Sequence, residues 1–179
     1  EILEPVVAAL QQKGIDYRGV IYAGLMLTNS GPKVIEFNCR FGDPECQTLM
    51  PLLDGDWAGV LLACAEGRLD QAPELNIKNV CSACVVAAAQ GYPEATRLGD
   101  RISDSGADLS DNDNCSQLFH AGVRADNGNL HTSGGRVLAA VAQGEDFDAA
   151  FSAAYSRLAQ VNFDGMNFRR DIGHQVRRP

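Results

Sequence analysis

Three different polar side chains alternate along one short segment of the sequence. Glu36, Asn38 and Arg40 stand two residues apart within the run KVIEFNCRF at 33–41. In a β-strand, side chains two positions apart share a face, so these three would point the same way. Carboxylate and carboxamide oxygens suit Mg²⁺, and a guanidinium suits phosphate or carboxylate. The spacing indicates a nucleotide-triphosphate site, although an exposed strand face with an internal salt bridge would show the same pattern.

Two extended segments and a turn would hold these side chains in place. The run from Tyr17 to Thr28 is rich in aromatic and β-branched residues, and Asn29-Ser30-Gly31-Pro32 separates it from the run at 33–41. This pattern predicts a β-hairpin. Apolar periodicity and capping residues predict three helices around it, over residues 2–10, 44–53 and 57–66.

The character of the sequence changes near residue 75, after a polar stretch that contains Pro73. We therefore expect one domain over residues 1–74 and a second, β-rich domain over residues 75–179, which together give an α+β fold. The expected elements of the second domain are three strands, one helix and one solvated acidic loop, at residues 80–89, 117–125, 137–143, 147–160 and 104–114.

Composition and charge narrow the classes of function. The chain has 179 residues, with 15 Lys and Arg against 23 Asp and Glu, and its formal net charge of −8 repels a nucleic-acid backbone. No apolar run approaches the roughly 18 to 20 residues that cross a bilayer. The six cysteines are too scattered for a disulfide-stapled secreted fold. We expect a cytoplasmic protein that binds neither nucleic acid nor membrane, and the first residue, Glu1, suggests a piece of a longer chain.

A second candidate anion site lies at Thr132-Ser133-Gly134-Gly135-Arg136. Paired glycines let backbone amides converge, and Arg136 adds positive charge, which together suit a phosphate. A tight turn between two strands would have the same sequence, and both interpretations are open.

The residues around the polar strand match a known family. The run Glu36-Phe37-Asn38-Cys39-Arg40-Phe41-Gly42-Asp43-Pro44-Glu45, preceded by Tyr22-Ala23-Gly24-Leu25-Met26, closely resembles the phosphoribosylamine–glycine ligases. Further matches at residues 91–93, 120–122 and 133–138 extend the resemblance over nearly the whole chain. The resemblance implies the carboxyl-terminal part of an ATP-grasp domain, followed by a small β-rich domain with one helix.

The resemblance also implies a reaction and its ligands. Members of this family join the carboxylate of glycine to the amine of 5-phosphoribosylamine, and they convert ATP to ADP and phosphate through a glycyl phosphate. ATP and Mg²⁺ or Mn²⁺ are therefore the expected cofactors, and glycine and 5-phosphoribosylamine are the expected substrates. An ATP-grasp site forms between two subdomains, so the amino-terminal domain and the rest of the ATP-grasp domain are the expected partners.

The family pattern assigns roles to individual residues. Glu36 and Asn38 become the metal and cofactor ligands, and the two oxygens of Glu36 could bridge two ions where Asn38 offers one oxygen. Arg40 becomes the catalytic and substrate-binding residue that holds the transferring phosphoryl group or the acyl phosphate. Asp43 either caps the helix that follows it, which we favour, or contacts the amine or ribose hydroxyls of the substrate; the two roles are compatible. Glu45 is expected to pair with the helix dipole.

Two other interpretations are open. A sister ATP-grasp ligase for another carboxylate and amine would also carry Glu-x-Asn on a strand, although the extension Arg-Phe-Gly-Asp-Pro-Glu argues against it. A binding module could keep the fold and perform no chemistry. On the leading interpretation the chain by itself should not catalyse the reaction.

Overall fold

The computed structural model describes residues 1–104 and 116–177, so all of the predicted acidic loop except its first residue lies outside the described residues. The described residues form two compact units. The first unit contains residues 1–46 and 53–77, and the second contains residues 47–52 and the residues from 78 onward. Helices and short sheets are mixed along the chain, which confirms the α+β class. The domain boundary near residue 75 stays a proposal. Among the described residues, no helix has the length and apolarity needed to cross a membrane.

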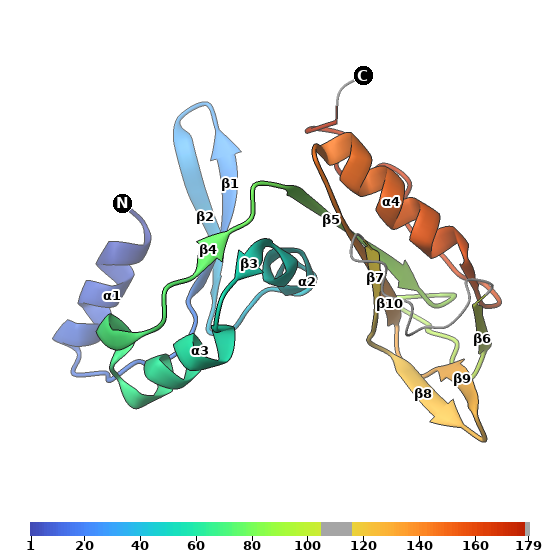
Figure 1. Cartoon of the computed structure of the whole chain (residues 1–179), viewed down its shortest axis with the longest axis horizontal. Helices are drawn as coiled ribbons and strands as arrows, with labels where there is room; N and C mark the ends of the chain where they lie inside the picture. The colour runs from blue at the N-terminus through green and yellow to red at the C-terminus, as the bar shows by residue number, and fades with distance from the viewer. Residues whose placement is uncertain (105–115, 178–179) are drawn as a thin grey trace. The chain divides into compact units, whose positions relative to one another are not determined.

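The first unit is built around a β-hairpin of β1 (Tyr22–Thr28) and β2 (Gly31–Asn38), which pair antiparallel (Figure 1). The predicted hairpin is confirmed, but both strands differ in extent. The segment before β1 is not strand, because the Tyr17 hydroxyl donates to the Val20 carbonyl at 2.7 Å and closes a local turn. The strand β2 ends at Asn38, three residues earlier than predicted.

Two of the three predicted helices of this part of the chain are confirmed as α1 (Leu3–Gln12) and α3 (Trp57–Glu66). The Asp56 carboxylate caps α3 by accepting a hydrogen bond from the Gly59 amide at 2.8 Å. The helix predicted over 44–53 is wrong in length. It is the five-residue α2 (Glu45–Leu49) followed by a 3₁₀ turn, η1 (Met50–Leu52), because Pro51 has no amide hydrogen and disfavours helical geometry in the preceding residue. The remaining short elements are β3 (Leu53–Asp54), η2 (Leu69–Gln71) and β4 (Asn76–Ile77).

The second unit contains two antiparallel sheets. One has the strand order β5 (Cys81–Ala88), β10 (Arg136–Gly144), β7 (Ser116–His120). The other has the order β11 (Val161–Asn162), β6 (Arg101–Asp104), β9 (Asn129–Thr132), β8 (Val123–Asp126). The strand predicted over 117–125 is therefore two strands, β7 and β8, which belong to different sheets and are separated at Ala121–Gly122.

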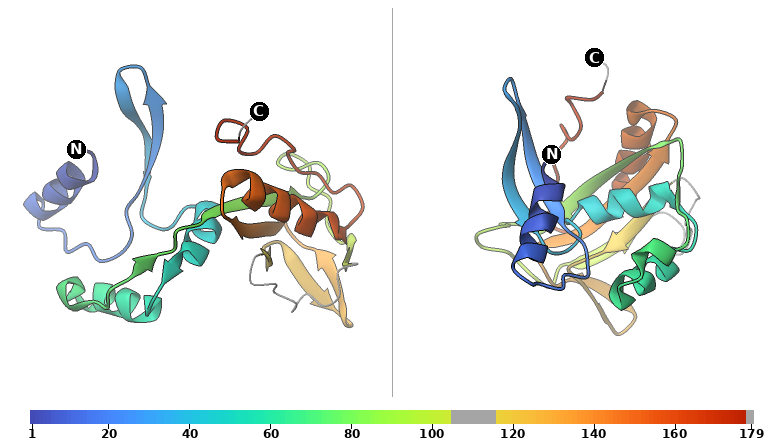
Figure 2. Two further views of the ribbon diagram at one scale, coloured as in Figure 1. Left: turned by 45° about the horizontal axis from the view of Figure 1, so that its top comes forward. Right: turned by 90° about the vertical axis from the view of Figure 1, so that its left-hand side faces the viewer.

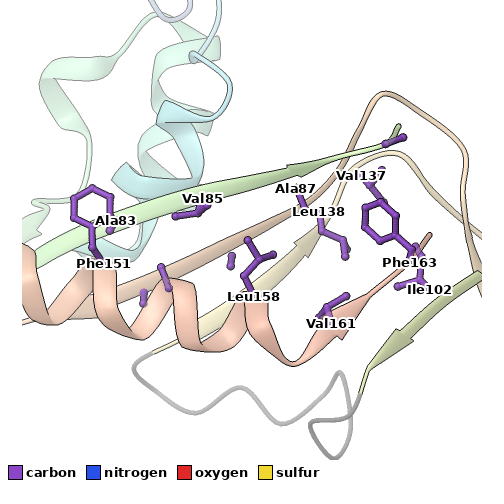
Figure 3. Close-up of a cluster of buried hydrophobic side chains, with 14 of the residues drawn as sticks. Ala83, Val85, Ala87, Ile102, Val137, Leu138, Phe151, Leu158, Val161 and Phe163 are labelled. Carbon is purple, nitrogen blue, oxygen red and sulfur yellow. The ribbon is translucent and has the colours of Figure 1, made fainter. Parts of the chain in front are cut away.

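The core of the second unit lies between its first sheet and α4 (Phe147–Ala159), which runs along β5 and β10 (Figure 2). Phe151 and Leu158 of α4 point toward the strands that carry Val85 and Leu138 (Figure 3). The buried positions of α4 recur at helical spacing, and all six residues 137–142 of β10 are buried. One charged residue of α4 is also buried: Arg157 pairs with Asp104, with 3.0 Å between Nη2 and Oδ2.

Candidate functional site

The structure brings Glu36 and Asn38 together on β2. The Asn38 carboxamide Nδ2 donates a hydrogen bond to Oε1 of Glu36 at 2.8 Å. Glu36 lies opposite Gly24 of β1, and a Cβ placed on Gly24 would be 3.2 Å from Cγ of Glu36, so a larger residue there would have to displace the Glu36 side chain slightly. Gly24 pairs with Glu36 and Leu25 pairs with Val34, so Ile35 of β2 has no partner on β1. This β-bulge lies directly before Glu36.

Arg40 departs from its predicted place on the strand face. Because β2 ends at Asn38, Arg40 lies in a bend beyond the ladder and is exposed. Its Nη1 donates to the carbonyl of Phe41 at 2.9 Å. The side chain therefore belongs to the loop at residues 39–44, which connects β2 to α2, and the alternation that aligned it with Glu36 does not extend that far.

Asp43 lies in the same loop and is exposed. The helix α2 begins at Glu45, so Pro44 occupies the position before its first residue and Asp43 lies one residue further out. The favoured role of Asp43 as the N-cap of this helix stays a prediction. Its contact with substrate stays a prediction.

Glu45 is turned toward the hairpin, which the sequence did not indicate. The Tyr22 hydroxyl donates to Oε1 of Glu45 at 3.2 Å, and Tyr22 is also the cross-strand partner of Asn38. Burial raises the pKa of Tyr22, and the nearby charges of Glu45 and Glu36 raise it further. Tyr22, Glu36, Asn38 and Glu45 thus form one polar cluster. Motif spacing could not reveal Tyr22, because it depends on the strand register.

The donor set is incomplete as a metal centre. Within residues 1–104 and 116–177, no group of three or more His, Cys, Asp or Glu side chains is placed to hold a metal ion. Glu36 and Asn38 contribute oxygen donors of the kind that Mg²⁺ and Mn²⁺ prefer, but octahedral coordination requires ligands beyond these two side chains.

The glycine-rich turn of the second unit has a packing explanation. Gly122 lies against Gly134, and a Cβ on Gly122 would be 2.6 Å from Cα of Gly134. The Tyr92 ring covers Gly135 so closely that a Cβ there would overlap it. Close backbone approach therefore accounts for these glycines, which favours the tight-turn interpretation of residues 132–136.

Two models of phosphoribosylglycinamide synthetase domains match parts of this chain. Residues 1–46 match the model of the phosphoribosylglycinamide synthetase ATP-grasp (A) domain, and residues 82–175 match the model of the phosphoribosylglycinamide synthetase C domain. The hairpin with Glu36 and Asn38 is thus the end of an ATP-grasp domain, and the second unit is a C domain. The chain belongs to the phosphoribosylglycinamide synthetase family, as the resemblance implied.

Several relatives are similar over almost the whole chain. A phosphoribosylamine–glycine ligase of Synechocystis is 47% identical over 98% of this chain and 42% of its own length. A bifunctional purine biosynthetic protein of Schizosaccharomyces pombe is 42% identical over 99% of this chain and 22% of its own length. The crystal structure of a phosphoribosylamine–glycine ligase of Thermotoga maritima superposes with a TM-score of 0.78 and 32% identity, covering 92% of this chain and 39% of that one. The chain therefore spans less than half the length of these relatives.

Proposed function

We propose that the protein to which this chain belongs ligates glycine to 5-phosphoribosylamine at the expense of ATP. The glycine carboxylate attacks the γ-phosphorus of ATP, which gives glycyl phosphate and ADP. The amine then attacks the carbonyl carbon, phosphate leaves, and the nitrogen loses a proton. The observation that carries this proposal is the adjacent oxygen pair of Glu36 and Asn38 in a chain 47% identical to a phosphoribosylamine–glycine ligase.

Glu36 and Asn38 are the residues expected to hold Mg²⁺ or Mn²⁺, because their oxygens suit a hard cation. Their mutual hydrogen bond uses Oε1 of Glu36 and Nδ2 of Asn38. The carboxylate of Glu36 and Oδ1 of Asn38 would supply the oxygen donors to such an ion. A bound metal would reduce the repulsion among the phosphate charges during phosphoryl transfer.

Arg40 and Asp43 are the residues expected to contact the reacting groups. A guanidinium has five N–H donors, and Nη1 of Arg40 uses one of them on the Phe41 carbonyl at 2.9 Å, so the same side chain could also donate to the transferring phosphoryl group or the acyl phosphate. The exposed carboxylate of Asp43 has the charge to bind the amine or the ribose hydroxyls of the substrate. Both roles are proposals, and both place the chemistry at the loop after β2.

The proposed partners are the rest of the ATP-grasp domain and the amino-terminal domain, which would supply the nucleotide-covering and glycine-binding parts of the site. The relatives are more than twice as long as this chain, which supports that expectation. The 179-residue chain should then be inactive alone. A cytoplasmic location is part of the same proposal, since the substrates are intermediates of nucleotide synthesis.

ADP release by the full-length protein tests the proposal. We expect release that requires glycine, freshly generated 5-phosphoribosylamine and Mg²⁺ together, and no release from the 179-residue chain. Release with a different carboxylate and amine pair would keep the fold and overturn the substrates. If ADP is never released and Mn²⁺–ATP does not bind, the chain is a binding module of the family instead.

A further inference from the structure

The loop at residues 39–44 carries two of the proposed site residues, Arg40 and Asp43, between β2 and α2. Neither side chain lies on a strand or helix, so the hydrogen-bond ladder of the hairpin does not fix its position. A reaction that places a phosphoryl group within about 3 to 3.5 Å of its acceptor needs such side chains held in place. The contacts at the two ends of the loop therefore matter for the chemistry.

Tyr22 contacts both ends of this loop. Its backbone pairs with Asn38, the last residue of β2, in the register of the hairpin. Its hydroxyl donates to Oε1 of Glu45, the first residue of α2, at 3.2 Å. One tyrosine thus links the residue before the loop to the residue after it.

Glu45 is itself held against the loop. Its side chain folds over Gly42, which is buried, and a Cβ on Gly42 would lie 2.9 Å from Cδ of Glu45. The amide of Cys46 donates to the carbonyl of Gly42 at 3.0 Å, which closes the turn beneath this carboxylate.

We infer that Tyr22 and Glu45 form a clamp that holds Arg40 and Asp43 in fixed positions beside the Glu36 and Asn38 pair. In this proposal both clamp residues are positioning residues, because they act on the reacting groups through the loop. Their catalytic consequence rests on the proposed function, whereas the ordering of the loop does not. Glu45 thus has a role other than the predicted pairing with the helix dipole.

The test uses the full-length protein with Tyr22→Phe and Glu45→Ala, which remove the hydrogen bond from either side. Glu45→Gln retains an acceptor oxygen and is the conservative rescue. Tyr155→Phe is the matched control, since the Tyr155 hydroxyl donates to the carbonyl of Arg169 at 2.9 Å in the second unit. Two readouts are needed: hydrogen exchange of the amides at residues 40–43, and kcat with KM for each substrate.

In Tyr22→Phe and Glu45→Ala we expect amide exchange at residues 40–43 to rise about tenfold and kcat to fall about tenfold, with KM for ATP changed less than twofold. The double variant should be no worse than either single one, because both remove the same contact. Glu45→Gln and Tyr155→Phe should stay near wild type in both readouts.

The clamp would be overturned if Tyr22→Phe had the same amide exchange at residues 40–43 and the same kcat as the control Tyr155→Phe. An exchange increase spread evenly over the hairpin would also overturn it, because that result means general loss of stability. If the wild-type protein releases no ADP with glycine and 5-phosphoribosylamine, the proposed function fails, while the exchange measurement still decides whether the clamp exists.

Discussion

At the scale of single residues, the candidate site combines two side chains on a strand with two side chains on the loop that follows it. Glu36 and Asn38 are fixed by strand geometry and by their own hydrogen bond. Arg40 and Asp43 lie on the loop beyond the strand, where the position of each depends on contacts outside the ladder. The position of the oxygen pair is therefore set by the strand, whereas the position of the charged pair depends on the contacts of the loop at residues 39–44.

Asp43→Asn in the full-length protein separates the two roles considered for Asp43. Asparagine retains the size and capping ability of aspartate but removes the charge. We expect kcat/KM for 5-phosphoribosylamine to fall about 10- to 100-fold, equivalent to about 1.4 to 2.7 kcal/mol of transition-state stabilisation. The melting temperature should stay within about 2 °C of wild type, since an exposed position off the helix contributes little to stability.

The control for this substitution is Asp70→Asn, which removes another exposed aspartate from the first unit. It should leave kcat/KM unchanged. A lower melting temperature with normal kcat/KM in Asp43→Asn would instead make Asp43 a purely structural residue.

At the scale of elements, α4 is the main stabilising helix of the second unit. Its buried side chains meet β5 and β10, and Leu158 is fully buried among them (Figure 3). The Asp146 carboxylate caps the helix by accepting from the Ala149 amide at 2.8 Å. This helix and its sheet form a core without contributions from the candidate site residues.

Leu158→Ala should reduce the free energy of unfolding of the second unit by about 2 to 5 kcal/mol, because it removes buried methyl groups and leaves a cavity. Leu98→Ala, at a position 56% exposed in the same unit, should change it by less than about 0.5 kcal/mol. Urea unfolding followed by circular dichroism compares the two variants. Equal midpoints would show that α4 is not the stabilising element.

The elements show which structural features sequence patterns can and cannot predict. Apolar periodicity and capping residues located the helices α1, α3 and α4, and apolar runs between turn residues located the strands β5 and β10, each within one or two residues of its observed bounds. The β-bulge at Ile35 and the early end of β2 were not predictable, because register depends on the partner strand. Glu36 and Asn38 were predictable as a pair, because alternation along one strand places them on the same face. The displacement of Arg40 and the contact of Tyr22 with Glu45 were not predictable, because they depend on where β2 ends and on its pairing with β1.

At the scale of the whole molecule, burial is distributed unevenly between the two units. Among the described residues, Ala63 is the one buried hydrophobic residue of the first unit, and all the other buried hydrophobic residues lie in the second unit. Leu27 and Ile35 of the hairpin are 82% and 64% exposed. A two-stranded hairpin is only marginally stable by itself in water.

We therefore expect the amides of β1 and β2 to exchange at least about 100-fold faster than those of β5 and β10 in the 179-residue chain. In the full-length protein we expect the same hairpin amides to be strongly protected, because the remainder of the ATP-grasp domain, which is one of the proposed partners, would pack against the hairpin. Hydrogen exchange followed by mass spectrometry makes this comparison. Equal protection of the hairpin in the two proteins would show that the first unit is stable without the rest of the domain.

Glu36→Gln in the full-length protein tests whether the strand β2 carries the metal-binding side of a ligase site. Glutamine conserves volume and the acceptor for Asn38 but removes the negative charge that a divalent cation requires. The measurement is steady-state ADP release with glycine, 5-phosphoribosylamine and Mg²⁺, beside the melting temperature. We expect at least about a 100-fold loss of turnover, equivalent to about 2.7 kcal/mol, with an unchanged melting temperature. Turnover equal to that of the wild type would remove Glu36 from the mechanism and leave β2 without a role in metal binding.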